Sequence, residues 1–501
     1  MHQINRDILK LAVPSILANI TVPIVGMVDI AVAGHLDASA ATLIGGIAVG
    51  SMLFDLLYWN FGFLRVGTGG LTAQAFGRKD WNECSRILTR ALGMSLAIAC
   101  CLLLIQWIFV KAAFLVVDCS PEVQQLASRY FFIRIWAAPA TLSLMALKGW
   151  FIGMQDSVSP MITDFVVNGM NVLMSIVLAL GVALPLAASD PSSLSDLTSR
   201  VLLPAMGFQG IALGTVVAQY SGLLVALMII AFKYRRKVFA DFVLADLRGV
   251  FKGGETRRFF VMNADLFVRS LCFIAIYIGF TVISARYGDV LLAVSSIMMK
   301  ILMIFSYFTD GFAYAGEAMT GRYIGAGDAF NLRKTVRWTF IWSMGLALLF
   351  IAVYHFGGVL LLRMMTSDAV VVEASKDFLP WLILMPVVGC AAFTWDGIFI
   401  GATGSREMRN SMLWSVVAFA AVWLIGLLLL TTLGPDAAGS VASVSPDQTL
   451  EVAAGADSDA TPYGIIAMHI LMAAYFAHLL ARTIYLTLKS RAVLRLEQKS
   501  R

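Results

Sequence analysis

Charged residues, histidines and paired cysteines are all scarce in this sequence. Asp, Glu, Lys and Arg make up 14% of its 501 residues, whereas a typical soluble domain has about 25%. The five histidines form no HxH or HExxH pattern, and the six cysteines form no CxxC pair. The sequence therefore argues against a soluble globular protein, a zinc site and a disulfide framework. We interpret the cysteines as small apolar residues.

Hydrophobic residues are abundant instead, at 59% of the chain. A compact core cannot bury so many, so lipid must surround part of the protein. Twelve apolar segments each exceed the ~20 residues that a helix needs to cross ~30 Å of hydrocarbon. They lie at residues 8–35, 41–66, 88–112, 128–151, 160–186, 206–232, 258–286, 290–318, 336–362, 378–400, 410–433 and 462–488. The sequence predicts an all-α integral membrane protein with twelve transmembrane helices.

The basic residues indicate how these helices are oriented. If the N-terminus is inside, the inner loops hold most of the 37 lysines and arginines, whereas the outer loop 434–461 has none. Positive residues favour the cytoplasmic side of a membrane. We therefore expect both termini in the cytoplasm and the chain in an inner or plasma membrane. The net charge of +6 follows this topology and does not indicate nucleic-acid binding.

The two halves of the chain resemble each other. WFIGMQDS, which begins at residue 150, recurs as IFIGATGS from residue 398, an offset of 248, and the segment 61–80 recurs at 310–328 with nearly the same offset. Six predicted helices separate the copies. Because six is even, the halves should share one orientation, as two six-helix bundles related by a parallel repeat. The predicted domains are an N-terminal bundle at 1–232, a basic cytoplasmic linker at 233–257 and a C-terminal bundle at 258–501.

Ionisable residues inside the apolar segments are the first candidates for function. Asp29 lies within the first segment. A charge inside the membrane is costly, so an aspartate there indicates a proton, ion or substrate site. In the second half, Asp265 and Arg269 are four residues apart and can pair on one helix face. A structural ion pair and a transport role both remain open for them, and Asp310 is a further candidate. Arg134 is expected to extend toward the membrane surface.

Several motifs resemble one family of membrane proteins. They are ILKLAVPSILANITVPIVGMVDIAVAGHLD from residue 8, GLTAQAFG from 70, WFIGMQDSVSP from 150, NGMNVL from 168, GFQGIALGTVVAQY from 207, DGFAYAGEA from 310 and DGIFIGATGSREMRNSM from 396. In this order they resemble the multidrug and toxic compound extrusion (MATE) family, specifically its DinF-like branch. The resemblance implies a monomer of twelve helices in two bundles, which exports organic compounds in exchange for H⁺ or Na⁺.

The resemblance also implies roles for individual residues. Asp29 matches an essential carboxylate of the first helix, and Pro14 matches a proline linked to bending of that helix. Asn168 and Asn171 match two asparagines of the fifth helix. The acidic position that follows them in many members is Ser175 here. This departure removes a second carboxylate, so it favours proton coupling through Asp29 alone over a two-carboxylate Na⁺ site.

Thr215 matches a polar position of the sixth helix in the same family. Together with Asn168, Asn171 and Ser175 it is expected to line the cavity around Asp29. For the two asparagines and Thr215, a purely structural role in joining helices is the alternative, because buried amides often do this in membranes.

Three functions are compared on this basis. The leading hypothesis is a secondary antiporter for amphipathic or cationic organic molecules, with H⁺ or Na⁺ as the coupling ion and no other cofactor. The alternative is a flippase for lipid-linked precursors, which would need a larger and more basic cavity. A membrane-embedded enzyme is disfavoured because the sequence shows no nucleophile–base set and no metal cluster.

Overall fold

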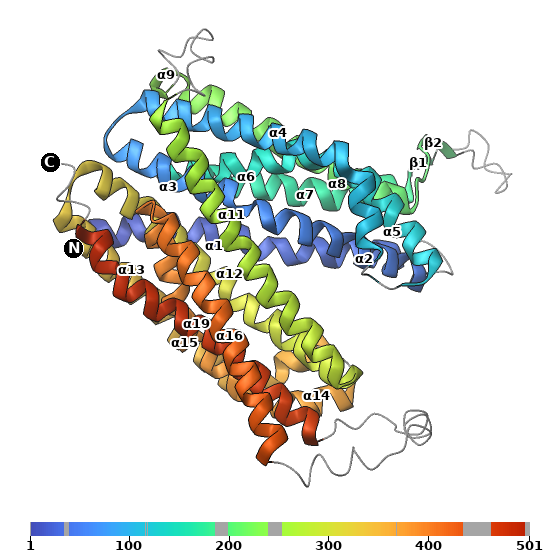
Figure 1. Cartoon of the computed structure of the whole chain (residues 1–501). Helices are drawn as coiled ribbons and strands as arrows, with labels where there is room; N and C mark the ends of the chain where they lie inside the picture. The colour runs from blue at the N-terminus through green and yellow to red at the C-terminus, as the bar shows by residue number, and fades with distance from the viewer. Residues whose placement is uncertain are drawn as a thin grey trace. The chain divides into compact units, whose positions relative to one another are not determined.

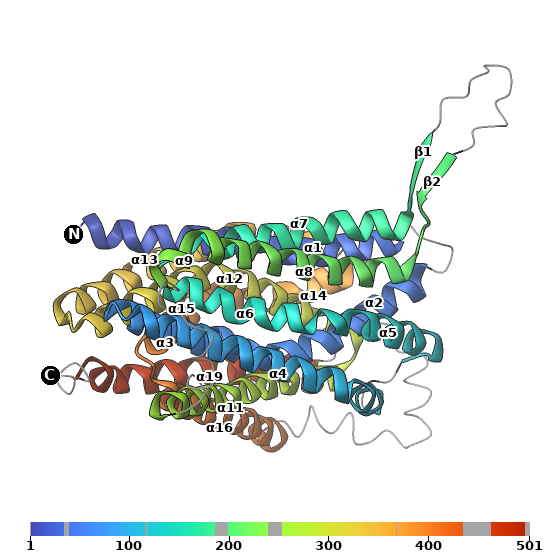
Figure 2. The ribbon, with the colours of Figure 1, turned by 90° about the horizontal axis from the view of Figure 1, so that it is seen from above.

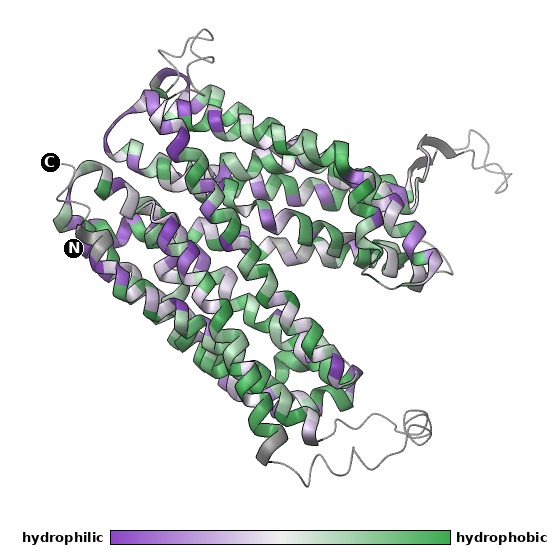
Figure 3. Ribbon diagram, viewed as in Figure 1, coloured by the Kyte–Doolittle hydropathy of each residue, from purple (hydrophilic) through white to green (hydrophobic). Residues whose placement is uncertain are grey.

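The computed structural model describes residues 2–34, 40–115, 117, 119–185, 199–238, 253–366, 368–433 and 462–495. Part of the predicted linker, residues 239–252, lies outside this range. Twelve helices of the described residues are long and apolar enough to cross a membrane. Apolar residues cover their length, and hydrophilic residues gather at helix ends such as the α3–α4 turn (Figure 3). The prediction of an all-α, multi-pass membrane protein is confirmed.

The chain divides into two compact units. The N-terminal unit comprises Val13–Phe259, and the C-terminal unit comprises Met1–Ala12 and Phe260–Arg501. The helix α1 (His2–Gly34) therefore contributes to both units, and so does α11 (Gly254–Ser284).

The N-terminal unit contains most of the first candidate span and the whole of the next five (Figure 1). Two of the spans are interrupted by short 3₁₀ turns, and another ends in a π-helix. After α1, its helices are α2 (Ala40–Trp59), α3 (Phe63–Gly77), α4 (Trp81–Ala113), α5 (Pro121–Arg134), α6 (Ala138–Gly153), α7 (Val158–Leu180), α8 (Phe208–Ile229), the π-helix Ile230–Tyr234 and α9 (Arg235–Val238). The 3₁₀ turns are Asn60–Gly62 and Ile135–Ala137.

The C-terminal unit contains the start of the first candidate span, most of the seventh and the whole of the last five. The helix α11 begins this set and ends in the 3₁₀ turn Ala285–Tyr287. The helices that follow are α12 (Asp289–Ala326), α13 (Ala329–Met365), the short α14 (Ala369–Lys376), α15 (Leu379–Gly401), α16 (Ser405–Leu433) and α19 (Pro462–Arg495). Buried apolar side chains from all of these helices form one core cluster in this unit.

A small β-hairpin is the one departure from an all-helical fold in the described residues. The strands β1 (Val182–Pro185) and β2 (Ser199–Leu203) pair antiparallel, with Ala183 opposite Val201. The hairpin follows α7 and precedes α8, and Figure 2 shows it extending beyond the ends of these helices. The strand β2 lies between the predicted segments 160–186 and 206–232, whereas β1 takes up the last residues of the segment 160–186, because α7 ends at Leu180. The hairpin leaves the number of candidate spans unchanged.

The internal repeat is visible in the turns that follow equivalent helices. Lys79 (φ 60°) corresponds to Gly327 (φ 68°), and Gln155 (φ 63°) corresponds to Thr403 (φ 55°), each pair 248 residues apart. After Lys79 and Gly327, the side chain of an aspartate caps the next helix: Asp80 accepts from the Glu83 nitrogen, and Asp328 accepts from the Asn331 nitrogen. Such caps satisfy backbone donors at a helix start. The internal repeat predicted from the sequence is confirmed.

Equivalent glycines also hold equivalent helix pairs together. A Cβ atom built on Gly149 of α6 would lie 2.1 Å from the Arg65 carbonyl oxygen of α3, and one on Gly397 of α15 would lie 2.1 Å from the Ala313 carbonyl oxygen of α12. No side chain fits at that distance, so glycine allows the two backbones to touch. The α3–α6 pair and the α12–α15 pair thus share one packing solution.

Candidate functional site

The site of the N-terminal unit begins with a close contact between α7 and α8. A Cβ atom at Gly210 would lie 2.5 Å from the α7 backbone, and one at Gly214 would lie 2.7 Å from the Ser175 nitrogen. Glycine is therefore required for this approach. The contact brings Thr215 of α8 to Asn171 of α7, whose amide donates to Thr215 Oγ1 over 3.0 Å.

Asp29 of α1 completes this polar network. Ser175 Oγ lies 2.9 Å from Asp29 Oδ1 and 3.4 Å from Asn171 Oδ1. A hydroxyl has a single proton, so Ser175 can donate to the carboxylate or to the amide, but not fully to both. Asp29 is 7% exposed, Asn171 4% and Ser175 0%. The structure thus brings Asp29, Asn171, Ser175 and Thr215 together in the interior of this unit.

Asn168 lies one helical turn before Asn171 and contacts a different part of α1. Its side-chain amide donates to Thr21 Oγ1 over 2.5 Å, and Thr21 donates to the Ala18 carbonyl over 2.7 Å. This contact joins α7 to α1 and fits the structural role that buried amides often have in membranes. Pro14 lies inside α1, close to the start of the N-terminal unit.

Arg134 differs from its predicted placement. Instead of extending to the membrane surface, its guanidinium turns toward α2: Nη1 donates to Tyr130 Oη over 3.1 Å and to Ser51 Oγ over 3.4 Å, and Cζ lies 4.8 Å from the centre of the Phe54 ring. The ring faces offer an electrostatic partner to a guanidinium. Spacing along one helix predicts snorkelling for Arg134 because it does not show that side chains of α2 lie beside α5.

Two carboxylates lie within electrostatic range of Arg134. One is Asp29, and the other is Asp55, an exposed residue of α2 that lies within the candidate span Thr42–Gly77. The sequence analysis did not single out Asp55, although a carboxylate inside a predicted span (41–66) is itself a signal for function.

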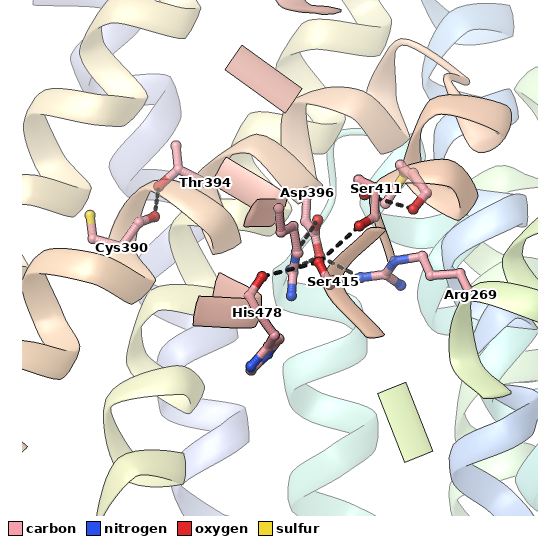
Figure 4. Close-up of polar contacts among 9 residues, drawn as sticks. Arg269, Cys390, Thr394, Asp396, Ser411, Ser415 and His478 are labelled. Atoms are coloured by element: carbon pink, nitrogen blue, oxygen red, sulfur yellow. Dashed lines mark hydrogen bonds and ion pairs between the residues drawn. The ribbon is translucent and has the colours of Figure 1, made fainter. Parts of the chain in front are cut away.

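The C-terminal unit contains a cluster of a different kind (Figure 4). Asp396 of α15 accepts from two arginines: Arg269 of α11 donates to Oδ2, and Arg482 of α19 donates through Nε to Oδ1 over 3.0 Å and through Nη2 to Oδ2. Nearby, Ser415 donates to the His478 carbonyl over 3.0 Å. Both oxygens of Asp396 are thus held by guanidinium groups, and a cation could bind it only by displacing an arginine.

The predicted pair of Asp265 and Arg269 has other partners in the structure. Asp265 accepts from Arg409 Nη1 over 2.5 Å and from Ser405 Oγ over 3.0 Å, while Arg269 donates to Asp396. Spacing along α11 predicts a contact between Asp265 and Arg269, but the contacts described here are with side chains of other helices. Arg482 was not among the predicted site residues, although an arginine inside the predicted segment 462–488 is a signal for function. Asp310 is half-buried on α12.

A third polar cluster lies at the turn between α6 and α7. Asp156 Oδ2 accepts from Lys233 Nζ over 2.7 Å, from Tyr234 Oη over 2.6 Å and from Ser159 Oγ over 2.5 Å. Burial of Asp156 opposes its ionisation. The three side-chain donors, joined by the Ser159 amide, outweigh burial and hold the pKa of Asp156 below its usual value. This cluster joins the π-helix Ile230–Tyr234, which follows α8, to the start of α7.

Metal-binding side chains do not gather in the part of the chain that the structure describes. No group of three or more His, Cys, Asp or Glu residues lies close enough to hold a metal ion among these residues. The oxygens around Asp29 are carboxylate, hydroxyl and amide groups. The carboxylate can accept a proton, and all of these oxygens are suitable ligands for a hard cation.

Comparison with known proteins decides the family. The sequence profile of the MatE family matches residues 14–187 and 266–430. The DNA damage-inducible protein F of Escherichia coli K12 is 35% identical over 434 residues, which cover 86% of this chain and 87% of that protein. The chain belongs to the MATE family. The resemblance of its motifs to the DinF-like branch is thereby confirmed, and MATE proteins are transporters rather than enzymes.

More distant MATE proteins agree with this assignment. The probable multidrug resistance protein NorM of Photorhabdus laumondii is 23% identical over 434 residues, covering 85% of this chain and 86% of that protein. A solved outward-facing multidrug resistance MATE transporter of the MOP superfamily superposes with a TM-score of 0.77 at 13% identity, covering 99% of this chain and 96% of that one. At this identity the superposition shows the shared MATE fold alone.

Proposed function

We propose that this MATE protein is a secondary antiporter of the cell membrane, with both termini in the cytoplasm. It exports amphipathic or cationic organic compounds in exchange for H⁺, or alternatively Na⁺, with Asp29 as the coupling carboxylate. One observation carries this proposal: Asp29 is a buried carboxylate inside a span, and its Oδ1 accepts from Ser175 within a network shared by α1, α7 and α8.

The partners of Asp29 make exchange chemically reasonable. Ser175 is a neutral donor, so it orients the carboxylate without neutralising its charge. Arg134 lies within electrostatic range of Asp29 but forms its hydrogen bonds with Tyr130 and Ser51, so it balances the carboxylate only from a distance. A charge inside a membrane is costly, so a bound proton, a cation or a cationic substrate stabilises Asp29 further. Since one carboxylate can hold one of these at a time, the incoming ion and the outgoing substrate compete for Asp29, which couples the two movements.

The conformational change of a transport cycle requires a helix that can bend. Pro14 cannot donate a backbone hydrogen bond, and prolines inside helices are common positions of kinks. It lies in α1, the helix that also carries Asp29. We infer that α1 bends near Pro14 when the occupancy of Asp29 changes. Asn171, Thr215 and Asn168 keep α7 and α8 in place around the carboxylate.

The substrate class follows from charge and from relatives. Asp55 presents a second carboxylate on the exposed surface of α2 within a span. Intramembrane carboxylates face water-filled space more often than lipid. We therefore infer that Asp55 faces water and adds negative charge to the path of the substrate. The NorM relative carries multidrug resistance in its name. Both points favour cationic, chemically varied substrates.

The test is transport by purified protein in proteoliposomes, with a fluorescent organic cation and with ΔpH and a Na⁺ gradient imposed separately. We expect uptake driven by ΔpH in the wild type and its loss in Asp29→Asn, because the amide cannot exchange a proton at neutral pH. Ser175→Ala should weaken coupling without abolishing it. Asp289→Asn, at the exposed start of α12, is a matched control that should transport normally.

The outcomes are distinguishable. Uptake driven by Na⁺ alone and lost in Asp29→Asn would keep Asp29 as the coupling residue and change the ion. Normal ΔpH-driven uptake by Asp29→Asn would overturn the mechanism. If wild-type protein moves no organic cation under either gradient but moves a lipid-linked precursor between leaflets, the chain is a flippase.

A further inference from the structure

Arg134 is an arginine inside a membrane span whose contacts, among the described residues, are with uncharged groups. It lies at the end of α5, within the candidate span Pro121–Gly153, and is half-buried. Its Nη1 donates to Tyr130 Oη and Ser51 Oγ, and its Cζ lies 4.8 Å from the centre of the Phe54 ring and 5.6 Å from that of Tyr130. Hydroxyls and ring faces hold a guanidinium in place without removing its charge.

Buried aromatic residues give this charge a defined position. Tyr130 and Phe54 are both fully buried, and the Phe54 ring stacks on the Phe131 ring with 4.7 Å between the centres. A Cβ atom at Gly50 would lie 2.6 Å from the Tyr130 ring, so glycine allows this ring to pack against the α2 backbone. The guanidinium therefore rests on a closely packed aromatic surface that α2 and α5 form together.

The helix α8 connects this aromatic surface to the network around Asp29. Phe208, at the start of α8, contacts Tyr130 with 5.9 Å between the ring centres. Thr215, about two turns later on the same helix, belongs to the network around Asp29. All of these residues are in the N-terminal unit. Arg134 thus lies within electrostatic range of Asp29, although its hydrogen bonds are with other side chains.

The ionisable groups within electrostatic range of Arg134 are Asp29, Asp55, Tyr58 and Tyr130. Tyrosine hydroxyls are neutral at physiological pH, because their ordinary pKa is about 10, so the two carboxylates are the charges that Arg134 affects. Asp55 is exposed, whereas Asp29 is 7% exposed. Buried charges are screened less than exposed ones. The effect of Arg134 on Asp29 is therefore the larger of the two.

We propose that Arg134 is a fixed positive charge that weakens the binding of cations at Asp29 and thereby allows a bound cation to be released. This role depends on the function proposed above for Asp29. Coulomb energy falls only with the inverse of distance, so a guanidinium beyond hydrogen-bond distance still repels a cation that binds the carboxylate. A carboxylate without a nearby positive charge would hold a cation tightly inside the membrane. Arg134 stabilises the empty carboxylate, which makes binding weak enough for turnover.

The experiment measures the dissociation constant of tetraphenylphosphonium, an organic cation, for the full-length protein in a neutral detergent. A pH of about 8.5, far above the ordinary carboxyl pKa, limits competition from protons. Two variants remove the charge: Arg134→Gln still donates hydrogen bonds, and Arg134→Met keeps an apolar side chain over Phe54. We expect both to bind on the order of tenfold more tightly than the wild type, the Coulomb effect of one charge beyond hydrogen-bond distance at an effective dielectric constant of about 20.

Transport separates this electrostatic role from a structural one. In proteoliposomes, the two neutral variants should show a lower KM and a lower maximal rate of exchange, because the cation leaves Asp29 more slowly. A purely structural contact between α2 and α5 predicts the opposite change in affinity, since its loss would lower the melting temperature and weaken binding. Melting temperatures measured in parallel identify the variants that are folded.

Two further variants serve as controls. Arg134→Lys keeps the positive charge and should bind the organic cation nearly as the wild type does. Arg129→Gln removes an exposed arginine from the same helix, five residues before Arg134, and should also bind nearly as the wild type does. Unchanged or weaker binding in a folded neutral variant would overturn the role of Arg134. Equal tightening by Arg129→Gln would overturn it as well, because it would indicate a general effect of surface charge.

Asp29→Asn distinguishes a failure of this role from a failure of the proposed function. If Asp29→Asn loses binding of tetraphenylphosphonium while Arg134→Gln and Arg134→Met bind it as the wild type does, only the role of Arg134 is wrong. If Asp29→Asn binds the cation as the wild type does, Asp29 is not the cation site, and the role of Arg134 fails with it.

Discussion

The two units share their backbone packing but differ in how they treat a buried carboxylate. In the N-terminal unit, Asp29 accepts from the neutral hydroxyl of Ser175. In the C-terminal unit, Asp396 is held by the guanidinium groups of Arg269 and Arg482. In the first arrangement no guanidinium is hydrogen-bonded to the carboxylate in the contacts described above, and Arg134 acts on it only from a distance, which is consistent with the exchange proposed for Asp29. The second balances it permanently with side chains of the protein.

The two halves of the repeat therefore share close backbone contacts between helices, but they differ in the charges of equivalent residues. Gly149 and Gly397 make the same contact with the facing helix in both units. Lys148, the repeat equivalent of Asp396, carries the opposite charge and pairs with Asp164 over 2.7 Å. We infer that the C-terminal charges support the fold of that unit, while the Asp29 network carries the coupling proposed above.

The largest expected effect comes from Asp396→Asn, which would leave two guanidinium groups in the interior without their carboxylate. Removing one member of a buried ion cluster costs about 3–5 kcal/mol in soluble proteins, so we expect a large fall in melting temperature in detergent. Asp29→Asn should leave the melting temperature nearly unchanged, because its hydrogen-bond partner is neutral. If Asp29→Asn destabilises the protein more than Asp396→Asn does, the comparison between the units is wrong.

A smaller effect is expected at the α6–α7 turn, where Asp156 has Gly404 as its repeat equivalent. The pKa of Asp156 is held below its usual value, so its contribution to stability is complete above the ordinary carboxyl pKa of about 3.9 and is lost as pH falls through the lower folded value. Asp156→Asn should therefore destabilise the protein at pH 7 by about 1.5–3 kcal/mol. The difference in melting temperature between wild type and variant should shrink as pH falls below about 4. A difference that does not change with pH would contradict this account.

The smallest effect concerns the glycines that the units share. Gly149→Ala and Gly397→Ala should each lower stability by about 1–3 kcal/mol, since the added methyl group pushes two helices apart. Both variants should shift the melting temperature by similar amounts. Gly169→Ala and Gly345→Ala are matched controls, because a Cβ atom at either position meets nothing within 4 Å. They should be neutral or slightly stabilising, as alanine favours a helix over glycine. Unequal effects of the first two variants would show that the repeat does not share its packing.

The sequence was sufficient to predict the spans and the repeat, because apolar length and a constant offset between similar segments are visible in one dimension. The group around Asp29 was implied by the resemblance to the MATE family. The structure brings Asn171, Ser175 and Thr215 to Asp29 but joins Asn168 to Thr21.

The sequence was insufficient for Arg269 and Arg134, because their partners Asp396 and Phe54 lie on other helices. Spacing along the sequence does not show whether a side chain contacts a residue of its own helix or a residue of an adjacent helix. Asp55 and Arg482 were overlooked although each lies inside a predicted span.

The division of α1 between the units has a consequence for biosynthesis. Residues Met1–Ala12 belong to the same unit as Phe260–Arg501, and Trp342 Nε1 donates to Asn5 Oδ1 over 3.4 Å. Ile8 is fully buried. The ribosome synthesises this short segment long before residues 260–501. The C-terminal unit can therefore be completed only after its last helices have been synthesised and have packed against the N-terminal segment. A fusion or deletion at the N-terminus would therefore disturb the last part of the protein to be inserted.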